Sequence, residues 1–320
     1  MKNLFPILLL ALTSPAWPEQ IDYHSVVAAD GSGDFTGIQE AIDSSKAFPG
    51  KRITLFIKSG VYREKVKVHE WNTSLSLVGE NRGRTIIVYN DHFRKIGRGG
   101  NSTFHTATVQ VDGDDFSMEN LTVKNSAGPS DQAVALAVNA DRAYFDNVNV
   151  IGNQDSLYLT GAGKRKYFKN CYIEGTTDFI FGRATAVFEN CRIHSKADSY
   201  ITAASTPEGI EYGFVFIGCR LTADEGINNV YLGRPWRPFA RTVFIHTEMD
   251  AHIRPEGWHN WSKPEAEKSV FYAEYGNTGK GANPAKRVGW SRQLSKRQAN
   301  RYRPDRILGK WIFSGKQDER

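Results

Sequence analysis

The sequence of 320 residues contains only three cysteines, and its one long apolar run lies at the extreme N-terminus. Three cysteines are too few for a disulfide scaffold, and no Cys-x-x-Cys pair or cysteine–histidine spacing indicates a metal site. No second stretch is apolar enough to cross a bilayer, so an integral membrane protein is not expected. A hydrophobic content of 40% and a charged content of 24% predict an ordinary folded domain.

The N-terminal run has the layout of a secretory signal peptide. Lys2 supplies a positive charge, residues 4–12 are apolar apart from one proline, and Ser14 to Ala16 offers small residues for cleavage. We therefore expect residues 1–16 to be removed and residues 17–320 to form the mature, secreted protein, periplasmic if the host is Gram-negative. The alternative interpretation is a buried N-terminal strand or helix.

The net charge of +6 and the isoelectric point of about 9.1 favour a polyanionic partner. No dense Lys/Arg run lies outside residues 287–306, and no nucleic-acid-binding motif is present. Together with the export signal, this pattern favours an extracellular acidic polysaccharide over a nucleic acid. A basic surface that serves only solubility remains the alternative.

A degenerate six-residue repeat dominates the middle of the chain. Its copies begin at Met118, Phe145, Phe168, Phe188, Phe216 and Phe244, at spacings of 27, 23, 20, 28 and 28 residues. Such spacings are typical of a stacked array. The copies are short β-branched and aromatic runs separated by Gly, Asn and Asp, with little room for helices. We therefore predict an all-β fold, a single-stranded right-handed parallel β-helix.

Equivalent positions of stacked coils form columns along such a fold. The third repeat position holds Asn120, Asn147, Asn170 and Asn190, whose side-chain amides are expected to hydrogen-bond from coil to coil. The next position holds Cys171, Cys191 and Cys219. Cys171 and Cys191 are the closest pair in sequence and either form a disulfide or pack as small apolar side chains.

Both ends of a β-helix need cover, because their outermost strands would otherwise be unpaired. Residues 37–45 (GIQEAIDSS) place Ile38, Ala41 and Ile42 on one helical face, which predicts a short N-terminal capping helix. The basic, polar residues 294–307 are expected to form a C-terminal helix or tail. No Pro/Gly/Ser-rich linker divides the chain, so we expect one catalytic domain and a monomer.

Two acidic residues share one column of the repeat. Asp155 lies ten residues after Phe145, and Asp178 lies ten residues after Phe168. Two carboxyl groups on neighbouring coils repel each other when ionised, so one should stay ionised while the other tends to hold a proton. This arrangement provides a nucleophile or base beside an acid. Asp198 has the same offset from its own phenylalanine, but its polar surroundings favour a surface role.

Polar and aromatic residues surround this pair in the sequence. Gln154 precedes Asp155, and Gln132 lies about one coil earlier, so both amides are candidates to donate hydrogen bonds to an oxyanion. Arg234 is a candidate to hold one carboxylate ionised. The aromatic residues Tyr158, Phe179, Phe181 and Trp236 are candidates to pack against sugar rings.

Several motifs, in order along the chain, resemble the pectin methylesterase (pectinesterase) family. They are residues 27–35 (VAADGSGDF), 60–64 (GVYRE), 132–136 (QAVAL), 152–157 (GNQDSL), 178–182 (DFIFG), 232–236 (LGRPW), 257–258 (GW), Trp261 and 274–279 (EYGNTG). The resemblance implies a right-handed parallel β-helix that hydrolyses the methyl esters of galacturonate units in pectin, without a metal or other cofactor.

The resemblance also implies roles for the site residues. Asp178 corresponds to the nucleophile, and Asp155 to the general acid that later acts as the base. Gln132 and Gln154 correspond to the oxyanion hole, and Arg234 to the residue that orients the nucleophile.

Three aromatic residues, Tyr158, Phe181 and Trp236, correspond to the substrate-binding cleft of the family. The chain departs from the family pattern at Ser156, where the family often has Thr, and at Ala137, where many members have Arg. Neither departure removes a group to which the resemblance gives a catalytic role.

Other functions are compatible with the same architecture. Pectin-active glycosidases also use paired carboxylates, and lyases commonly use calcium held by acidic clusters. The glutamines that flank the two aspartates favour the esterase. An esterase acting on a different acyl ester and a non-catalytic carbohydrate-binding protein are the remaining alternatives.

Overall fold

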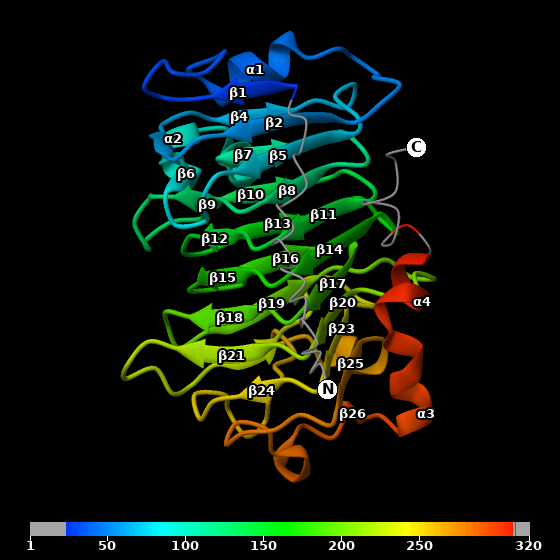
Figure 1. The fold of residues 1–320 in the computed structure, drawn as a ribbon. Coiled ribbons are helices and arrows are strands. Elements are labelled where there is room, and N and C mark those ends of the chain that lie inside the picture. Colours follow the sequence, from blue (N-terminus) through cyan, green and yellow to red (C-terminus); the bar gives the residue numbers. More distant parts are fainter. Residues whose placement is uncertain (1–23, 310, 312–320) are drawn as a thin grey trace, which may run out of the picture.

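The computed structural model describes residues 24–309 and 311, so the predicted signal peptide lies outside the described residues. The described chain forms three parallel sheets that run along one stack of coils (Figure 1). Each full coil contributes one strand to each sheet in turn, as β11, β12 and β13 do in sheets A, B and C. This arrangement confirms the predicted parallel β-helix.

The three sheets have the following strands, each list running in hydrogen-bonded order. Sheet A comprises β1 (Ser25–Val27), β2 (Ile53–Ile57), β5 (Leu75–Gly79), β8 (Ser117–Glu119), β11 (Ala143–Asp146), β14 (Arg165–Lys169), β17 (Thr185–Glu189), β20 (Phe214–Ile217), β23 (Arg241–Ile245), β25 (Phe271–Tyr275) and β26 (Arg292–Gln293). Sheet B comprises β3 (Gly60–Tyr62), β6 (Thr85–Tyr89), β9 (Thr122–Asn125), β12 (Asn149–Ile151), β15 (Tyr172–Gly175), β18 (Arg192–Ser195), β21 (Arg220–Ala223) and β24 (Glu248–Met249). Sheet C comprises β4 (Val66–Val68), β7 (Val109–Val111), β10 (Leu136–Val138), β13 (Leu157–Leu159), β16 (Ile180–Gly182), β19 (Tyr200–Ala204) and β22 (Tyr231–Gly233).

The helices are short and lie in connections between strands or in the C-terminal segment of the chain. They are α1 (Ile38–Ser44), α2 (Phe93–Ile96), α3 (Lys296–Ala299) and α4 (Pro304–Leu308), with 3-10 turns η1 (Gly99–His105), η2 (Pro264–Lys268), η3 (Pro284–Lys286) and η4 (Asn300–Tyr302). None of the helices within residues 24–309 and 311 is long and apolar enough to span a membrane.

The first residues of the repeat form the interior phenylalanine column that the spacing predicts. Phe145, Phe168, Phe188, Phe216 and Phe244 pair in register across sheet A, and their ring centroids are 4.4, 5.0, 4.5 and 4.4 Å apart in sequence order. All five rings are fully buried. Stacked aromatic rings at this spacing contribute to stability beyond the area that they bury, so the repeat sets the register of the coils.

The asparagine column lies at the turn between sheets A and B. Asn120, Asn147, Asn170 and Asn190 all have φ between 53° and 56°, a left-handed conformation that asparagine tolerates better than most residues. The predicted amide ladder is shorter than expected. Asn147 donates to the side chain of Asn120 at 2.7 Å, but Asn170 donates instead to Asp146 at 2.9 Å. The backbone conformation therefore accounts for the column better than the ladder does.

The three cysteines next to this column are buried free thiols. Their Sγ–H groups donate to backbone carbonyls, as Cys171 does to Lys169 at 3.2 Å and Cys219 to Phe188 at 3.3 Å. Of the two alternatives for Cys171 and Cys191, the structure therefore has the packed thiols and not the disulfide.

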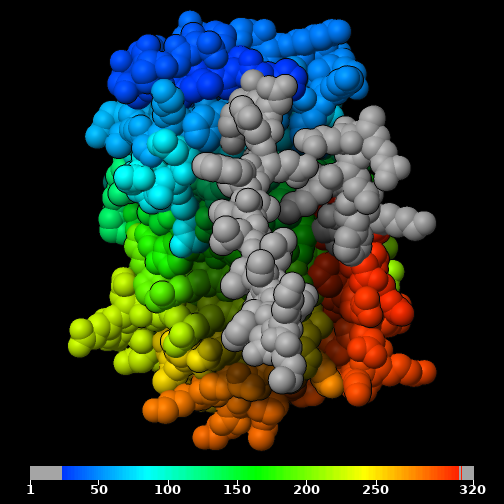
Figure 2. Space-filling view, viewed as in Figure 1, coloured from blue at the N-terminus to red at the C-terminus, as the bar shows by residue number. Residues whose placement is uncertain are grey.

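Both terminal segments contain helices. Helix α1 lies at the N-terminal end of the stack, and it buries Ile38, Ala41 and Ile42, as the sequence predicts (Figure 1). At the other end, residues 294–307 form helical turns along the outer face of sheet A, where Leu308 packs against Val187 and its neighbours. The space-filling view shows the coils layered in sequence order, with this segment on one flank (Figure 2).

Candidate active site

The two aspartates of the predicted pair lie on neighbouring coils, just before strands β13 and β16 of sheet C. Those strands pair in register, Leu157 beside Ile180, so Asp155 and Asp178 occupy the same column two residues earlier. Both residues have positive φ, 66° and 50°, and both are buried, with 4% and 6% of their surface exposed. Non-glycine residues in this region are strained, and such strain concentrates at functional sites.

Arg234 contacts one aspartate of the pair and not the other. Its Nε donates to Oδ1 of Asp178 at 2.9 Å, and its Nη2 donates to Oδ2 at 2.6 Å. The guanidinium carbon lies 3.9 Å from the ring centroid of Tyr200 and 3.6 Å from that of Trp261. Bidentate charge-assisted bonds and two aromatic contacts hold the arginine in one orientation.

The surroundings of the two carboxyl groups affect their pKa values differently. Burial and then the charge of Asp178 raise the pKa of Asp155 well above its usual value. Burial also raises the pKa of Asp178, but the hydrogen bonds and charge of Arg234 act against this rise. Asp155 therefore favours its protonated form, while Asp178 has the cation that stabilises its carboxylate.

The two glutamines also meet on adjacent coils. Gln132 and Gln154 form an isolated parallel bridge, both residues are half-buried, and Gln154 directly precedes Asp155. The side chain of Gln132 lowers the pKa of the Asp155 carboxyl group, which partly offsets the effect of burial. The structure therefore brings together all five polar residues that the sequence singled out.

Aromatic side chains form a wall on the outer face of sheet C beside the aspartates. Tyr158 and Phe181 stack at 4.7 Å, Phe181 lies 5.9 Å from Trp236, and Phe104 lies 5.2 Å from Tyr158. Phe179, which the sequence also suggested, is fully buried in the interior core and cannot contact a ligand. The wall presents an apolar surface beside the two aspartates.

Some residues of this site were missed in the sequence. Phe104 and Tyr200 gave no signal, and Trp261 was noted only as part of a motif. Ala137 lies beside Tyr158 on the neighbouring strand and packs in one apolar cluster with Phe181. Asp198 is exposed and accepts hydrogen bonds from the backbone N–H groups of residues 228 and 229, as expected for a surface turn.

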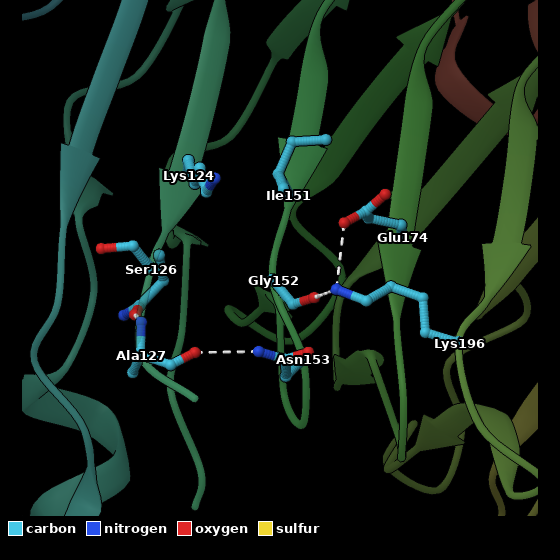
Figure 3. Close-up of a pocket in the computed structure, with 9 residues that line it drawn as sticks. Lys124, Ser126, Ala127, Ile151, Gly152, Asn153, Glu174 and Lys196 are labelled. Carbon is cyan, nitrogen blue, oxygen red and sulfur yellow. Dashed lines mark hydrogen bonds and ion pairs between the residues drawn. The ribbon is translucent and has the colours of Figure 1, made fainter. Parts of the chain in front are cut away.

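The loop that carries Gln154 and Asp155 is anchored from behind, at a polar pocket of about 250 Å³ (Figure 3). There Nζ of Lys196 donates to the carbonyl of Gly152 at 2.7 Å and contacts Glu174 at 3.0 Å. On the other side, Asn153 donates to the carbonyl of Ala127 at 2.8 Å. These contacts tie the loop to the coils before and after it.

Within residues 24–309 and 311, no three or more His, Cys, Asp or Glu side chains are grouped closely enough to hold a metal ion. The polar residues that accompany the two aspartates include an arginine and two glutamines, whose side chains are suited to stabilising negative charge by hydrogen bonding.

Comparison with known proteins identifies the family. The pectinesterase family model matches residues 24–310. The chain belongs to the pectinesterase family. Pectinesterase 31 of Arabidopsis thaliana is 41% identical over 284 residues, which cover 86% of this chain and 89% of that protein. Pectinesterase 2 of Citrus sinensis is 39% identical over 277 residues and 83% of this chain, but the match spans only 53% of that longer protein.

Solved pectinesterase structures have the same fold. The pectin methylesterase from carrot superposes with a TM-score of 0.85 at 34% identity, covering 91% of this chain and 94% of that one. A pectin methylesterase in complex with a hexasaccharide superposes with a TM-score of 0.80 at 32% identity, covering 91% and 98%.

Proposed function

We propose that this chain hydrolyses methyl esters of galacturonate units in pectin and releases methanol, with Asp178 as nucleophile and Asp155 as acid and base. The chain is a carboxylic ester hydrolase of the pectinesterase type. The observation that carries the assignment of roles is the bidentate contact of Arg234 with only one of two buried, stacked aspartates. A nucleophile must be ionised, and an acid must hold a proton.

In the first step, a carboxylate oxygen of Asp178 attacks the C6 carbonyl carbon of a methylated galacturonate. The carbonyl oxygen becomes an oxyanion, to which the side-chain amides of Gln132 and Gln154 donate hydrogen bonds. When the intermediate collapses, the bond from C6 to the methoxy oxygen breaks, and Asp155 gives its proton to that oxygen. Methanol leaves, and C6 remains joined to Asp178 as an acid anhydride.

In the second step, the carboxylate of Asp155 takes a proton from water as the water oxygen attacks C6. The same two amides stabilise the second oxyanion. The bond between C6 and Asp178 then breaks, which restores the Asp178 carboxylate beside Arg234 and leaves galacturonic acid in the polymer. Asp155 has regained its proton, so both residues return to their starting states.

The aromatic wall is the surface on which we place the polymer. Phe181 and Trp236 lie beside Asp178, and Tyr158 lies one coil away, so sugar rings packed on them would present C6 to the nucleophile. A related pectin methylesterase has been solved in complex with a hexasaccharide, which supports a carbohydrate ligand for a protein of this fold. We further propose that residues 17–320 act as one secreted, monomeric catalytic domain that has no nucleic-acid or membrane partner and needs no cofactor.

Replacing Asp178 by Asn tests the proposal. The variant has nearly the same shape but no nucleophilic carboxylate, so methanol release from methylated pectin should fall by at least about 10³-fold while the fold persists. Asp198→Asn is the matched control, because this exposed residue has the same offset in its repeat. A second assay for new reducing ends and unsaturated products separates the esterase from a glycosidase or lyase. Wild-type-like methanol release by the Asp178→Asn variant would refute the assignment.

A further inference from the structure

Gln132 has a side-chain neighbour that the mechanism does not use. The hydroxyl of Thr103 donates to Oε1 of Gln132 at 2.8 Å. Thr103 belongs to η1, a connection 29 residues earlier in the chain, and only 5% of its surface is exposed. No hydrogen bond within the described residues joins Thr103 to either aspartate. Thr103 is therefore linked to the site through Gln132.

The orientation of the Gln132 amide decides whether it helps the reaction. A glutamine side chain has a donor NH₂ and an acceptor oxygen of nearly the same size. Only the NH₂ stabilises an oxyanion, whereas an amide oxygen turned toward the reacting carbonyl would repel the developing charge. Because the Thr103 hydroxyl donates to Oε1, the NH₂ is the end of the amide that remains to donate to another group, and the Gln132 side chain lowers the pKa of Asp155, as a donor does.

Thr103 is itself fixed in place by hydrogen bonds to the strand segment that carries Gln132. Its carbonyl accepts from the hydroxyl of Thr106 at 2.7 Å, and that hydroxyl accepts from the backbone N–H of Val134 at 2.9 Å. The backbone carbonyl of Gln132 accepts from the N–H of Phe93 at 2.9 Å. The 3-10 turn and the segment with Gln132 therefore form one hydrogen-bonded unit.

We propose that Thr103 is a positioning residue for this reaction: its hydroxyl holds the Gln132 amide with the NH₂ directed at the oxyanion. The inference rests on the proposed function, because it assigns the amide to the oxyanion hole. Such a residue acts on the transition state more than on the bound substrate. Its loss should therefore lower kcat and leave KM nearly unchanged.

The experiment uses Thr103→Val, which keeps the shape but removes the donor, and Thr103→Ser, which keeps the hydroxyl. We expect kcat for methanol release to fall about tenfold or more in Thr103→Val, with KM within about threefold, and to recover largely in Thr103→Ser. Thr108→Val is the matched control, since Thr108 is fully buried nearby and bonds the carbonyl of Lys124 instead.

A double-variant cycle separates positioning from a merely structural role. In a Gln132→Ala background, Thr103→Val should have no further effect on kcat, because the amide that Thr103 orients is gone. If Thr103→Val fails to fold, Thr103→Ala replaces it in the same cycle. An unchanged kcat in the single variant, or an equal loss in both backgrounds, would overturn the positioning role alone. A wild-type chain that releases no methanol would overturn the proposed function and this inference together.

Discussion

Arg234 binds both carboxylate oxygens of Asp178, and its guanidinium group lies against the rings of Tyr200 and Trp261. Among residues 24–309 and 311, no cation makes a salt bridge with the nearby Asp155, although the charge of Arg234 also lowers its pKa. Two side chains of the same chemical type, stacked on neighbouring coils, are thereby placed in different electrostatic surroundings. This difference is the physical basis of the roles that we propose for them, and it can be tested by changing the arginine.

Replacing Arg234 by Gln should shift the pH dependence of the reaction. Removing the hydrogen bonds and positive charge that lower the pKa of Asp178 leaves only burial, which raises that pKa. The ionised nucleophile then forms only at higher pH, so the acid limb of the kcat/KM profile should move upward. We also expect a loss of about 10²-fold at the optimum.

Measurement of kcat/KM for methanol release across pH tests this shift. Arg234→Lys should keep part of the charge but not the planar, bidentate contact, and it should fall between the wild type and the Gln variant. Arg220→Gln is the control, because Arg220 is an exposed arginine near Glu248 and Asp250. An acid limb at the same pH in Arg234→Gln would contradict the assigned electrostatic role.

Replacing Asp155 by Asn should stabilise the protein at neutral pH while abolishing activity. The pKa of Asp155 is raised in the folded state, so the native protein favours the protonated carboxyl group. Below the unfolded pKa of about 4, this group costs nothing; between that pKa and the raised folded pKa, the unfolded chain releases the proton while the native protein retains it, so the free energy of unfolding falls as pH rises. The neutral amide of Asn removes that cost.

We expect a gain in the free energy of unfolding of about 1–3 kcal/mol near pH 8, decreasing toward pH 4. Urea unfolding at both pH values measures it, and Asp198→Asn should show no such gain. A variant that is less stable than the wild type at pH 8, or a gain that does not depend on pH, would argue against a buried carboxyl group with a raised pKa.

Replacing Lys196 by Met should lower kcat, although Lys196 takes no part in the proposed chemical steps. The ammonium group holds the carbonyl of Gly152 and the carboxylate of Glu174, and this anchors the loop that ends in Gln154 and Asp155. A displacement of about 1 Å at a reacting group can cost about 10²-fold, so we expect kcat to fall about tenfold or more.

Lys124→Met is the matched control for this prediction. Lys124 lines the same pocket, but its side chain is exposed and lies away from the loop contacts (Figure 3). Steady-state kinetics of methanol release should therefore separate the two variants. Equal kcat values for Lys196→Met and Lys124→Met would show that the loop keeps its geometry without the ammonium group.

The far end of the stack contains a buried ion pair that should matter for stability and not for catalysis. Nε of Arg287 contacts Oε1 of Glu274 at 2.8 Å, and their side chains are 2% and 4% exposed. Arg287→Met would leave the Glu274 carboxylate buried without its cation, at a cost of about 3–5 kcal/mol. Urea unfolding should show this loss, with kcat retained where the variant is folded.

A double variant, Arg287→Met with Glu274→Leu, removes both charges and should recover much of the lost stability. If the single variant unfolds like the wild type, water or another group must already compensate the carboxylate, and the pair has no stabilising role.

Much of this architecture follows from local patterns in the sequence. The regular return of Phe145 and its equivalents fixes the coil length, because each ring must stack on the next in the interior. Once the coil length is fixed, the offset of ten residues places Asp155 and Asp178 one above the other. Helix α1 follows from the same logic, since its apolar residues have helical spacing and are buried.

Other features depended on contacts between residues distant in sequence. The asparagine column was interpreted through side-chain amides, whereas a left-handed backbone turn accounts for it in the structure. Whether Cys171 and Cys191 form a disulfide was undecided from spacing, because equivalent positions on adjacent coils are compatible with both outcomes. Phe179 lies two residues before Phe181, and strand alternation would place both on one face, but Phe179 precedes β16 and packs in the interior core.

The sequence by itself determined the coil, the stacked aspartates and the family, because each of these depends on spacing along the chain or on short motifs. Only the tertiary structure decided which aspartate has the cation, and that Thr103, Lys196 and Trp261 support the site. Those residues come from loops and coils whose separation in the sequence has no fixed period. Their positions follow from how the coils stack and how the connecting loops fold back onto sheet C.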